Sequence, residues 1–486
     1  MIPGSSPTLR TSMLALVAGG ALGLAACAVN PATGEREFSL ISEQQEIEMG
    51  READQQVSAS LGLVDDPELQ RYVSDIGLRL AASSERPHLP WSFKVVDDPV
   101  VNAFALPGGF IYVTRGILAN FETEAELAGV LGHEIGHVTA RHSVSQMSRQ
   151  QLQQIGLGVG MIFSEGVRRY GDILAAGIGV LNLRYSRGDE TESDELGVRY
   201  MTRTGYDPEA LVGVFEMLAS VSGGQDGRVP EWQLTHPYPE NRESHIREVI
   251  AASEVPADGR VARDAYLDRI GGIVYGENPR EGYFKGARFL HPDMAFELTF
   301  PEGWKTVNQR TAVGAVSPAE DALVVLELVA DADDPVVALR AFLAQEGMQG
   351  GTIRQDDAYG IPSARAEFTV SGQQGDVRGL ATFLRHRDRV FRILGYASAE
   401  RWSANARVVE ASHGTFRPVT DAAVLGVRPW RLEVVRVSQA MSLRAFHERY
   451  PSIVPLEEIA RLNRMPVDGS VRSGARMKRV VGDPLP

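Results

Sequence analysis

The spacing of apolar residues changes about half-way along the chain and divides the sequence into a helical part and a strand-rich part. In the helical part, apolar residues recur at helical spacing over Glu43–Val57, over Leu69–Ala82 and in a later segment. Between these helices, Trp91–Val96 and Phe110–Thr114 alternate apolar and polar residues, which predicts strands. We therefore expect a mainly helical first domain, residues 27–253, with a small edge sheet.

In the strand-rich part, residues 283–420, the alternation has the two-residue period of strands, with helical patterns at Pro335–Gln345 and Glu400–Ser412. This combination predicts an α+β domain with an antiparallel sheet. Residues 254–282 contain several Gly and Pro residues around a short helix at Ala262–Ile270, which predicts a linker. The strands are expected at Ala295–Phe300, Leu323–Val329, Ala364–Val370, Gly379–Leu384 and Val390–Tyr396.

The last segment, residues 421–486, predicts a small βααβ unit. Its order of elements resembles the glycan-binding LysM module, although Gln439-Ala440-Met441-Ser442 stands where LysM repeats usually have Gly-Asp-Thr. From Gly426 to Pro486 there are eleven Arg or Lys residues and six Asp or Glu residues. We therefore expect contact with peptidoglycan or another anionic envelope surface, by a module whose loss leaves peptide hydrolysis intact. The elements are expected at Arg431–Val437, Leu443–Tyr450, Leu456–Asn463 and Arg476–Val481.

The first 26 residues have the pattern of a signal peptide. An apolar run from Met13 to Leu24 is too short to span a bilayer. It ends in Leu24-Ala25-Ala26-Cys27, which resembles the lipobox of bacterial lipoproteins. The resemblance implies cleavage before Cys27, acylation of its thiol and, because residue 28 is alanine, a location on the periplasmic side of the outer membrane. The alternative is a plain secretory signal with an incidental cysteine.

Composition narrows the classes of function. The chain has 486 residues, enough for two to four domains, and a net charge of −14, which argues against a nucleic-acid partner. Cys27 is the only cysteine, so an internal disulfide and a thiolate zinc site are both excluded.

The pentapeptide His133-Glu134-Ile135-Gly136-His137 carries the chemistry of the first domain. Thr123 and Glu126 predict a capped helix through it, and two histidines four residues apart share one face of a helix. Both imidazoles can then bind one Zn²⁺, with Glu134 as a general base. Gly132 and Gly136 are poor helix formers, which indicates that another backbone or a substrate strand packs closely there. The alternative is a chance match on a polar helix face.

A catalytic zinc needs a third protein ligand and an open position. Glu190 and Asp194 are again four residues apart, so Glu190 can bind the metal while Asp194 accepts a hydrogen bond from a ligating histidine. The alternative is a solvated acidic helix.

The combination resembles the gluzincin zinc metallopeptidases that include HtpX, the CaaX prenyl proteases, Oma-type proteases and the BepA-like periplasmic lipoprotein proteases. The resemblance covers roughly residues 30–250 and implies one zinc held by His133, His137 and Glu190, with Glu134 as the base. The matching residues are Asn102-Ala103-Phe104-Ala105-Leu106-Pro107-Gly108-Gly109, His133–Val138, Arg141-His142, Glu190, Asp194, Thr235-His236-Pro237 and Arg242.

The same resemblance places His236 and Arg242 on the cleft side. There they either stabilise the oxyanion of the tetrahedral intermediate, or His236 caps the zinc in a latent form. The alternative for His236 is a Thr-His-Pro turn that holds only its own backbone. His142 follows His137 by five residues, off the ligand face, and is expected to be structural.

Two further segments concern access to the site. Ala103, Phe104 and Ala105 are expected at a sheet edge that pairs with an extended substrate backbone. The apolar runs Ile155–Phe163 and Ile173–Leu181 are too short to span a bilayer. They predict either buried helices or a mobile lid or membrane-facing patch.

Together these features predict a secreted, lipid-anchored zinc endopeptidase that acts on unfolded or misassembled proteins of the cell envelope, a role in protein quality control. Two alternatives stay open: a periplasmic chaperone or assembly factor with a latent metal site, and a scaffold anchored to peptidoglycan. The intact Glu134 favours catalysis, because a binding protein needs no base.

Overall fold

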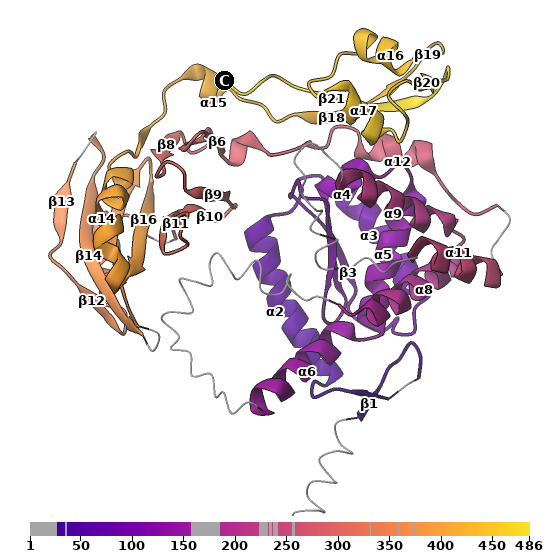
Figure 1. Ribbon diagram of the computed structural model, residues 1–486, viewed down its shortest axis with the longest axis horizontal. Coiled ribbons are helices and arrows are strands. Elements are labelled where there is room, and N and C mark those ends of the chain that lie inside the picture. The colour runs from indigo at the N-terminus through magenta and orange to yellow at the C-terminus, as the bar shows by residue number, and fades with distance from the viewer. Residues whose placement is uncertain are drawn as a thin grey trace, which may run out of the picture.

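The computed structural model describes residues 27–34, 36–156, 185–222, 232, 236, 242–254, 258–330, 332–357, 360–372 and 375–486 (Figure 1). The expected signal peptide and most of the two apolar runs after Ile155 lie outside these residues. Within them the fold is α+β, as predicted: a helical region with a small sheet, followed by a large antiparallel sheet. No helix in the described ranges is long and apolar enough to cross a membrane.

The first region is built on helices that surround a small sheet, and the predicted helices and strands are present with ends shifted by a few residues. Its strands are β1 (Cys27–Val29), β2 (Arg36–Phe38), β3 (Ser92–Val96), β4 (Ala103–Leu106) and β5 (Phe110–Thr114). Its helices are α2 (Glu43–Leu61), α3 (Pro67–Ala81), α4 (Arg115–Asn120), α5 (Glu124–Thr139), α6 (His142–Gly156), α8 (Arg187–Arg203), α9 (Glu209–Ser222), α11 (Arg242–Ala252) and α12 (Arg263–Ile270).

In this small sheet the strand order is β3-β5-β4, so β3 and β4 are its two edge strands among the described residues. The residues predicted for an edge lie in β4. Strand β4 runs antiparallel to β5, with Phe104 opposite Tyr112. Ala103 and Ala105 pack into the core that contains α5, whereas Phe104 belongs to a separate apolar cluster with α2 and stacks on Tyr112 at 4.9 Å. The two faces of β4 therefore contact different helices.

The second region is an antiparallel sheet covered on both faces. Its strand order is β12-β14-β15-β16-β11-β10-β9, with β13 also paired to β14. Helix α13 packs on one face, and α14 with a four-stranded sheet, β17-β8-β7-β6, packs on the other. Its strands are β6 (Tyr283–Lys285), β7 (Arg288–His291), β8 (Phe296–Thr299), β9 (Lys305–Asn308), β10 (Ala312–Val316), β11 (Ala322–Val329), β12 (Met348–Gly350), β13 (Arg354–Asp356), β14 (Ser363–Gly372), β15 (Gly375–His386), β16 (Arg389–Ser398) and β17 (Arg417–Pro418). Its helices are η1 (Pro279–Glu281), α13 (Pro335–Leu343), α14 (Ala399–His413) and α15 (Ala422–Leu425).

The C-terminal region contains the predicted strand, two helices and strand, together with two further short strands, and it shares its core with the first region. Leu432, Phe446 and Val480 belong to one continuous apolar cluster with Phe121, just before α5. Helix α12, in the segment expected to be a linker, packs in the same cluster, and Figure 1 shows it beside the C-terminal elements. These elements are β18 (Arg431–Arg436), β19 (Met441–Ser442), α16 (Leu443–Arg449), α17 (Leu456–Leu462), β20 (Ser470–Val471) and β21 (Arg476–Val481).

Candidate metal centre

Helix α5 presents the two histidines of the pentapeptide to the interior. The predicted capping box is present: the Thr123 hydroxyl accepts a hydrogen bond from the Glu126 amide at 3.1 Å, and the Glu126 carboxylate accepts one from the Thr123 amide at 3.2 Å. The side chains of His133, Glu134 and His137 are all buried. Such burial of polar groups is stable only when they have partners, so their surroundings define the site.

Glycines let α5 and α8 cross almost backbone to backbone. A Cβ atom at Gly136 would lie 3.0 Å from the Cα of Ser193, and one at Gly197 would lie 3.2 Å from the His133 nitrogen. The close backbone predicted from the glycines of α5 is therefore that of α8. This crossing carries Glu190 and Asp194 to the histidines of α5.

Four side chains converge on one point. One ligand atom from each of His133, His137, Glu190 and His236 lies within 4.8 Å of the others, and all four residues are buried. The Nε2 atoms of His133 and His137 are 3.0 Å apart, and Glu190 Oε1 lies 3.4 Å from His137 Nε2. Burial lowers the pKa of His137, which keeps its imidazole neutral and able to bind a metal.

The donor set fits zinc. Glu190 Oε2 is buried and accepts no aligned hydrogen bond from a described residue, although Arg242 Nη2 lies 3.1 Å away. Two imidazoles and a carboxylate are a typical ligand set for a catalytic zinc. Burial opposes ionisation of Glu190, but His236 and His137 outweigh it and hold the pKa of this carboxyl well below its usual range.

Asp194 orients the first histidine. Its Oδ1 lies 2.8 Å from His133 Nδ1, which leaves Nε2 for the metal, as predicted from the spacing. Arg242 donates to both oxygens of Asp194, at 2.6 and 2.8 Å, and its guanidinium lies 4.2 Å from the centre of the Phe215 ring. Burial raises the pKa of Asp194, but Arg242 and His133 more than compensate and lower it, so the carboxylate stays ionised.

His142 contacts the second histidine, a role that the sequence analysis did not assign. The Nδ1 atoms of His142 and His137 are 3.0 Å apart, and His142 Nε2 lies 3.3 Å from Glu192 Oε2. Arg141, at the end of α5, has a φ of 60°, so the chain leaves the helical path before His142. Tyr185 stacks on the His137 ring at 3.8 Å.

Glu134 and His236 lie together beside the ligands. Glu134 Oε1 accepts a hydrogen bond from Trp232 Nε1 at 3.4 Å and lies 3.6 Å from His236 Nε2, while its Oε2 accepts none from a described residue. His236 Nδ1 lies 2.9 Å from Glu190 Oε1. A carboxylate with an uncommitted oxygen and an imidazole therefore face the same point.

The other predicted site residues are not members of this cluster, although Ala103 and Ala105 pack in the same core as α5. Ala103, Phe104 and Ala105 form the edge strand β4, and Cys27 is the first residue of β1.

The model of peptidase family M48 matches residues 67–250, which hold every ligand described above. A second match is the mitochondrial metalloendopeptidase OMA1 of Schizosaccharomyces pombe, 31% identical over 235 residues that cover 46% of this chain and 67% of that protein. The chain belongs to peptidase family M48. Its membership agrees with the ligand set, because M48 members are zinc metalloendopeptidases and the cluster fits one zinc ion.

Two further proteins are similar to parts of this chain. The chain is 34% identical over 227 residues to the beta-barrel assembly-enhancing protease of Yersinia pestis. The matched residues cover 45% of this chain and 46% of that protein. The chain thus spans less than half the length of that M48 relative. Cyanobacterial PsbP from Synechocystis superposes with a TM-score of 0.22 and 13% identity, covering 28% of this chain and 94% of that one.

Proposed function

We propose that this chain is a zinc-dependent endopeptidase that acts on unfolded or misassembled proteins of the bacterial cell envelope. The observation that carries the proposal is the placement of Glu134, a buried carboxylate with an uncommitted oxygen beside the ligand cluster. His133, His137 and Glu190 would hold the metal. When bound, zinc supplies a Lewis acid that polarises the scissile carbonyl and makes water a better nucleophile at neutral pH.

The chain's own groups move the proton and orient the ligands. Glu134 accepts the proton of the attacking water and returns it to the leaving amine. Asp194 and His142 hold the rings of His133 and His137. Arg242 holds Asp194, and His236 would either stabilise the oxyanion or bind the metal as a further ligand in a resting form.

Substitution of the base tests the reaction. Glu134→Gln removes only the base, so the variant should keep one zinc per chain and lose casein hydrolysis. His133→Ala, His137→Ala or Glu190→Ala should lose the metal, and a chelator should abolish wild-type activity. Glu195→Gln, a half-exposed acidic residue of α8 that is not in the cluster, is the matched control. Full activity of Glu134→Gln would contradict the mechanism.

A second candidate function, a chaperone or assembly factor with a latent site, is favoured by burial. His133 and Glu190 are 0% exposed and His236 is 2% exposed, so the described structure has a closed centre. Client binding without hydrolysis by the zinc-loaded wild-type chain would support this function.

The proposed location of the protein rests on Cys27. Acylation of Cys27 would anchor the protein to a membrane of the cell envelope, on the periplasmic side. We propose that this membrane is the outer membrane. The beta-barrel assembly-enhancing protease of Yersinia pestis carries a name that agrees with an envelope role. Fatty acid released from purified protein, and its loss in Cys27→Ala, would be the direct observation; membrane fractionation unchanged by Cys27→Ala would exclude this anchor.

Peptidoglycan is the proposed second contact, through the C-terminal region. With Gln439-Ala440-Met441-Ser442 in place of Gly-Asp-Thr, we expect weak binding that salt screens. Pelleting of the whole chain with sacculi at low and high salt tests it. Binding that resists salt would indicate specific glycan recognition, and no binding at low salt would exclude the contact.

A further inference from the structure

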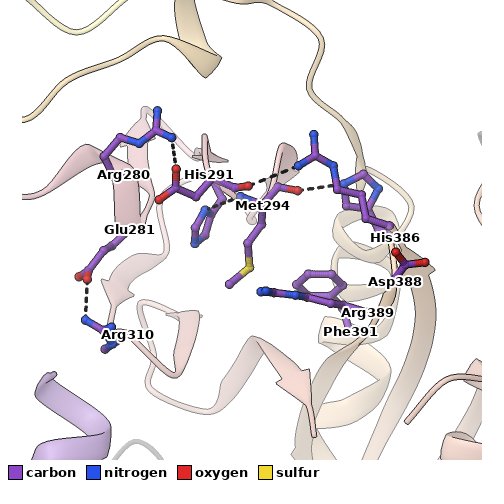
Figure 2. Close-up of a pocket in the computed structure, with 11 residues that line it drawn as sticks. Arg280, Glu281, His291, Met294, Arg310, His386, Asp388, Arg389 and Phe391 are labelled. Carbon is purple, nitrogen blue, oxygen red and sulfur yellow. Dashed lines mark hydrogen bonds and ion pairs between the residues drawn. The ribbon is translucent and has the colours of Figure 1, made fainter. Parts of the chain in front are cut away.

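Two neighbouring cavities at the second region share lining residues. The larger, about 610 Å³, is lined by Arg280, His291, Arg389 and Phe391 among others (Figure 2). The second, about 330 Å³, lies between the second region and the first. The ion pair of Glu281 and Arg310, 2.8 Å apart and drawn in Figure 2, lines both.

The second cavity opens beside the edge strand of the first region. Asn102 and Phe104, at the start of β4, line one side, and the β9–β10 segment with Asn308 and Arg310 lines the other. Arg310 lies against the end of α2, where a Cβ atom at Gly62 would come within 2.4 Å of its Nη1. A polypeptide paired with β4 would turn alternate side chains towards the Phe104 face, and hence towards this cavity.

Asn102 presents an acceptor that lacks a donor. Its side chain is 3% exposed, and its Oδ1 accepts no hydrogen bond from any described residue. The backbone of Asn102 is fixed, because its amide donates to Thr114 Oγ1 at 3.2 Å and its carbonyl accepts from the Thr114 amide at 3.0 Å. A buried amide oxygen in a fixed position next to a cavity indicates a ligand with an N–H group.

Carboxylates outnumber cations around the same cavity. Asp97, Asp98, Glu277 and Glu281 line it, against Arg115 and Arg310. Arg115 already pairs with Asp97 and donates to the carbonyls of Val274 and Gly276, and Arg310 pairs with Glu281.

Burial and the excess of negative charge both affect the pKa values of the carboxyl groups. Burial raises the pKa of Asp98 and of Glu281, and the nearby Asp97 raises both further. A bound positive charge would relieve this repulsion.

We propose that this cavity is a specificity subsite that receives the ammonium or guanidinium group of a lysine or arginine in an extended substrate paired with β4. The inference rests on the proposed endopeptidase function. Asn102 Oδ1 accepts one N–H of the cation, and Asp98 and Glu281 supply the compensating charge. The apolar stem of the side chain lies along Phe104.

Peptide hydrolysis by the full zinc-loaded chain tests the subsite. In a series of otherwise identical peptides, a single lysine is moved one position at a time, and each peptide is compared with its acetyl-lysine counterpart. At one position, acetylation should raise KM about tenfold and leave kcat unchanged, as expected for loss of a charged hydrogen bond. Absence of a preferred position would overturn the proposal.

Removal of negative charge inside the cavity is the second test of the subsite. Asp98→Asn with Glu281→Gln should abolish the preference for lysine, while Asp65→Asn, on an exposed residue outside the cavity, should retain it. Zinc content equal to wild type shows that the variants are folded. A preference that persists in the double variant would contradict the assignment.

Binding separates this inference from the proposed function. Fluorescence anisotropy of labelled lysine and acetyl-lysine peptides on the Glu134→Gln chain measures the subsite without hydrolysis. If no peptide is cleaved by wild type yet the lysine peptide binds more tightly, the endopeptidase function fails and the subsite stands. Equal binding of the two peptides would refute the subsite.

Discussion

The ammonium group of Lys478 lies 3.0 Å from Oε1 of Glu122, and both side chains are buried. Lys478 also donates to the carbonyls of Ala119 and Phe121, at 3.1 and 3.0 Å. Glu122 immediately precedes Thr123, the residue that caps α5. The C-terminal region therefore holds the segment from which the metal-binding helix starts.

Breaking this pair should destabilise the first region. Lys478→Met removes one of the two cations at the buried Glu122 carboxylate and leaves only Arg263, which should lower the free energy of unfolding by about 1–3 kcal/mol. Urea unfolding and zinc content measure the effect. Arg472→Met, on an exposed residue of the same region, should change the free energy by less than about 0.5 kcal/mol. Equal stability of the two variants would contradict the proposed bracing.

Removal of residues 421–486 should cost peptide hydrolysis, contrary to the expectation from sequence. The truncation exposes the part of the core that Leu432, Phe446 and Val480 cover. We expect residues 27–420 to be poorly soluble or to bind less zinc than the full chain. A truncated protein with wild-type activity would show that the shared core is dispensable.

The side chains behind the two histidines should tune metal affinity without abolishing it. Asp194→Ala and His142→Ala each remove one partner of a ligand ring, and losses of this kind typically weaken metal binding or activity about 10–100-fold. Zinc competition with a chromogenic chelator measures the change. His245→Ala alters a half-exposed histidine that is not in the cluster and should behave as wild type.

The two roles proposed for His236 predict opposite changes in proteolytic activity when this residue is replaced. If His236 occupies the fourth position in a resting enzyme, His236→Ala should raise basal casein hydrolysis. If it stabilises the oxyanion, activity should fall by about 10²–10³. Its contact with Glu190, a proposed zinc ligand, favours the resting role. Unchanged activity of the variant would mean that His236 has only a structural role in its turn.

The second region should lose stability as the pH falls below about 6.5. Burial, with a contribution from Arg365, lowers the pKa of His413 to about 3. Between these pH values the unfolded chain binds a proton at His413 that the folded chain does not, so His413 alone lowers the free energy of unfolding by about 1.4 kcal/mol per pH unit. Burial of His291, whose pKa is lowered to about 4, adds to this slope. His413→Gln should reduce this slope, measured by hydrogen exchange in β15 and β16 between pH 4 and 7. An identical slope would exclude His413 as the cause.

Local pattern predicted much of the metal centre. The capping box at Thr123 and Glu126 gave the start of α5, and four-residue spacings gave His133, His137 and Glu190, because neighbours on a helix follow a fixed period. The contact of His142 with His137 was not predicted because Arg141, with a φ of 60°, takes the chain off the helical path, so the helical period no longer applies.

Contacts between distant segments were not predictable in this way. The basic excess of the C-terminal region suggested an anionic envelope surface. In the structure, part of that charge is used internally: Lys478 pairs with Glu122 and Arg464 with Glu126. Each of these pairs joins residues more than 300 positions apart, and no local periodicity encodes such a contact.

The crossing of α5 and α8 at Gly136 and Gly197 has a consequence for how the metal is acquired. Because the two backbones touch, His133 and Glu190 hold their relative positions through the helices rather than through the ion. Small metal domains fold only when the ion arrives, so part of their binding energy is spent on ordering the ligands. In this chain the helices already order the ligands, so little of the binding energy is needed for ordering them. Chelation should leave a folded apoprotein, with zinc required for the reaction and not for the architecture.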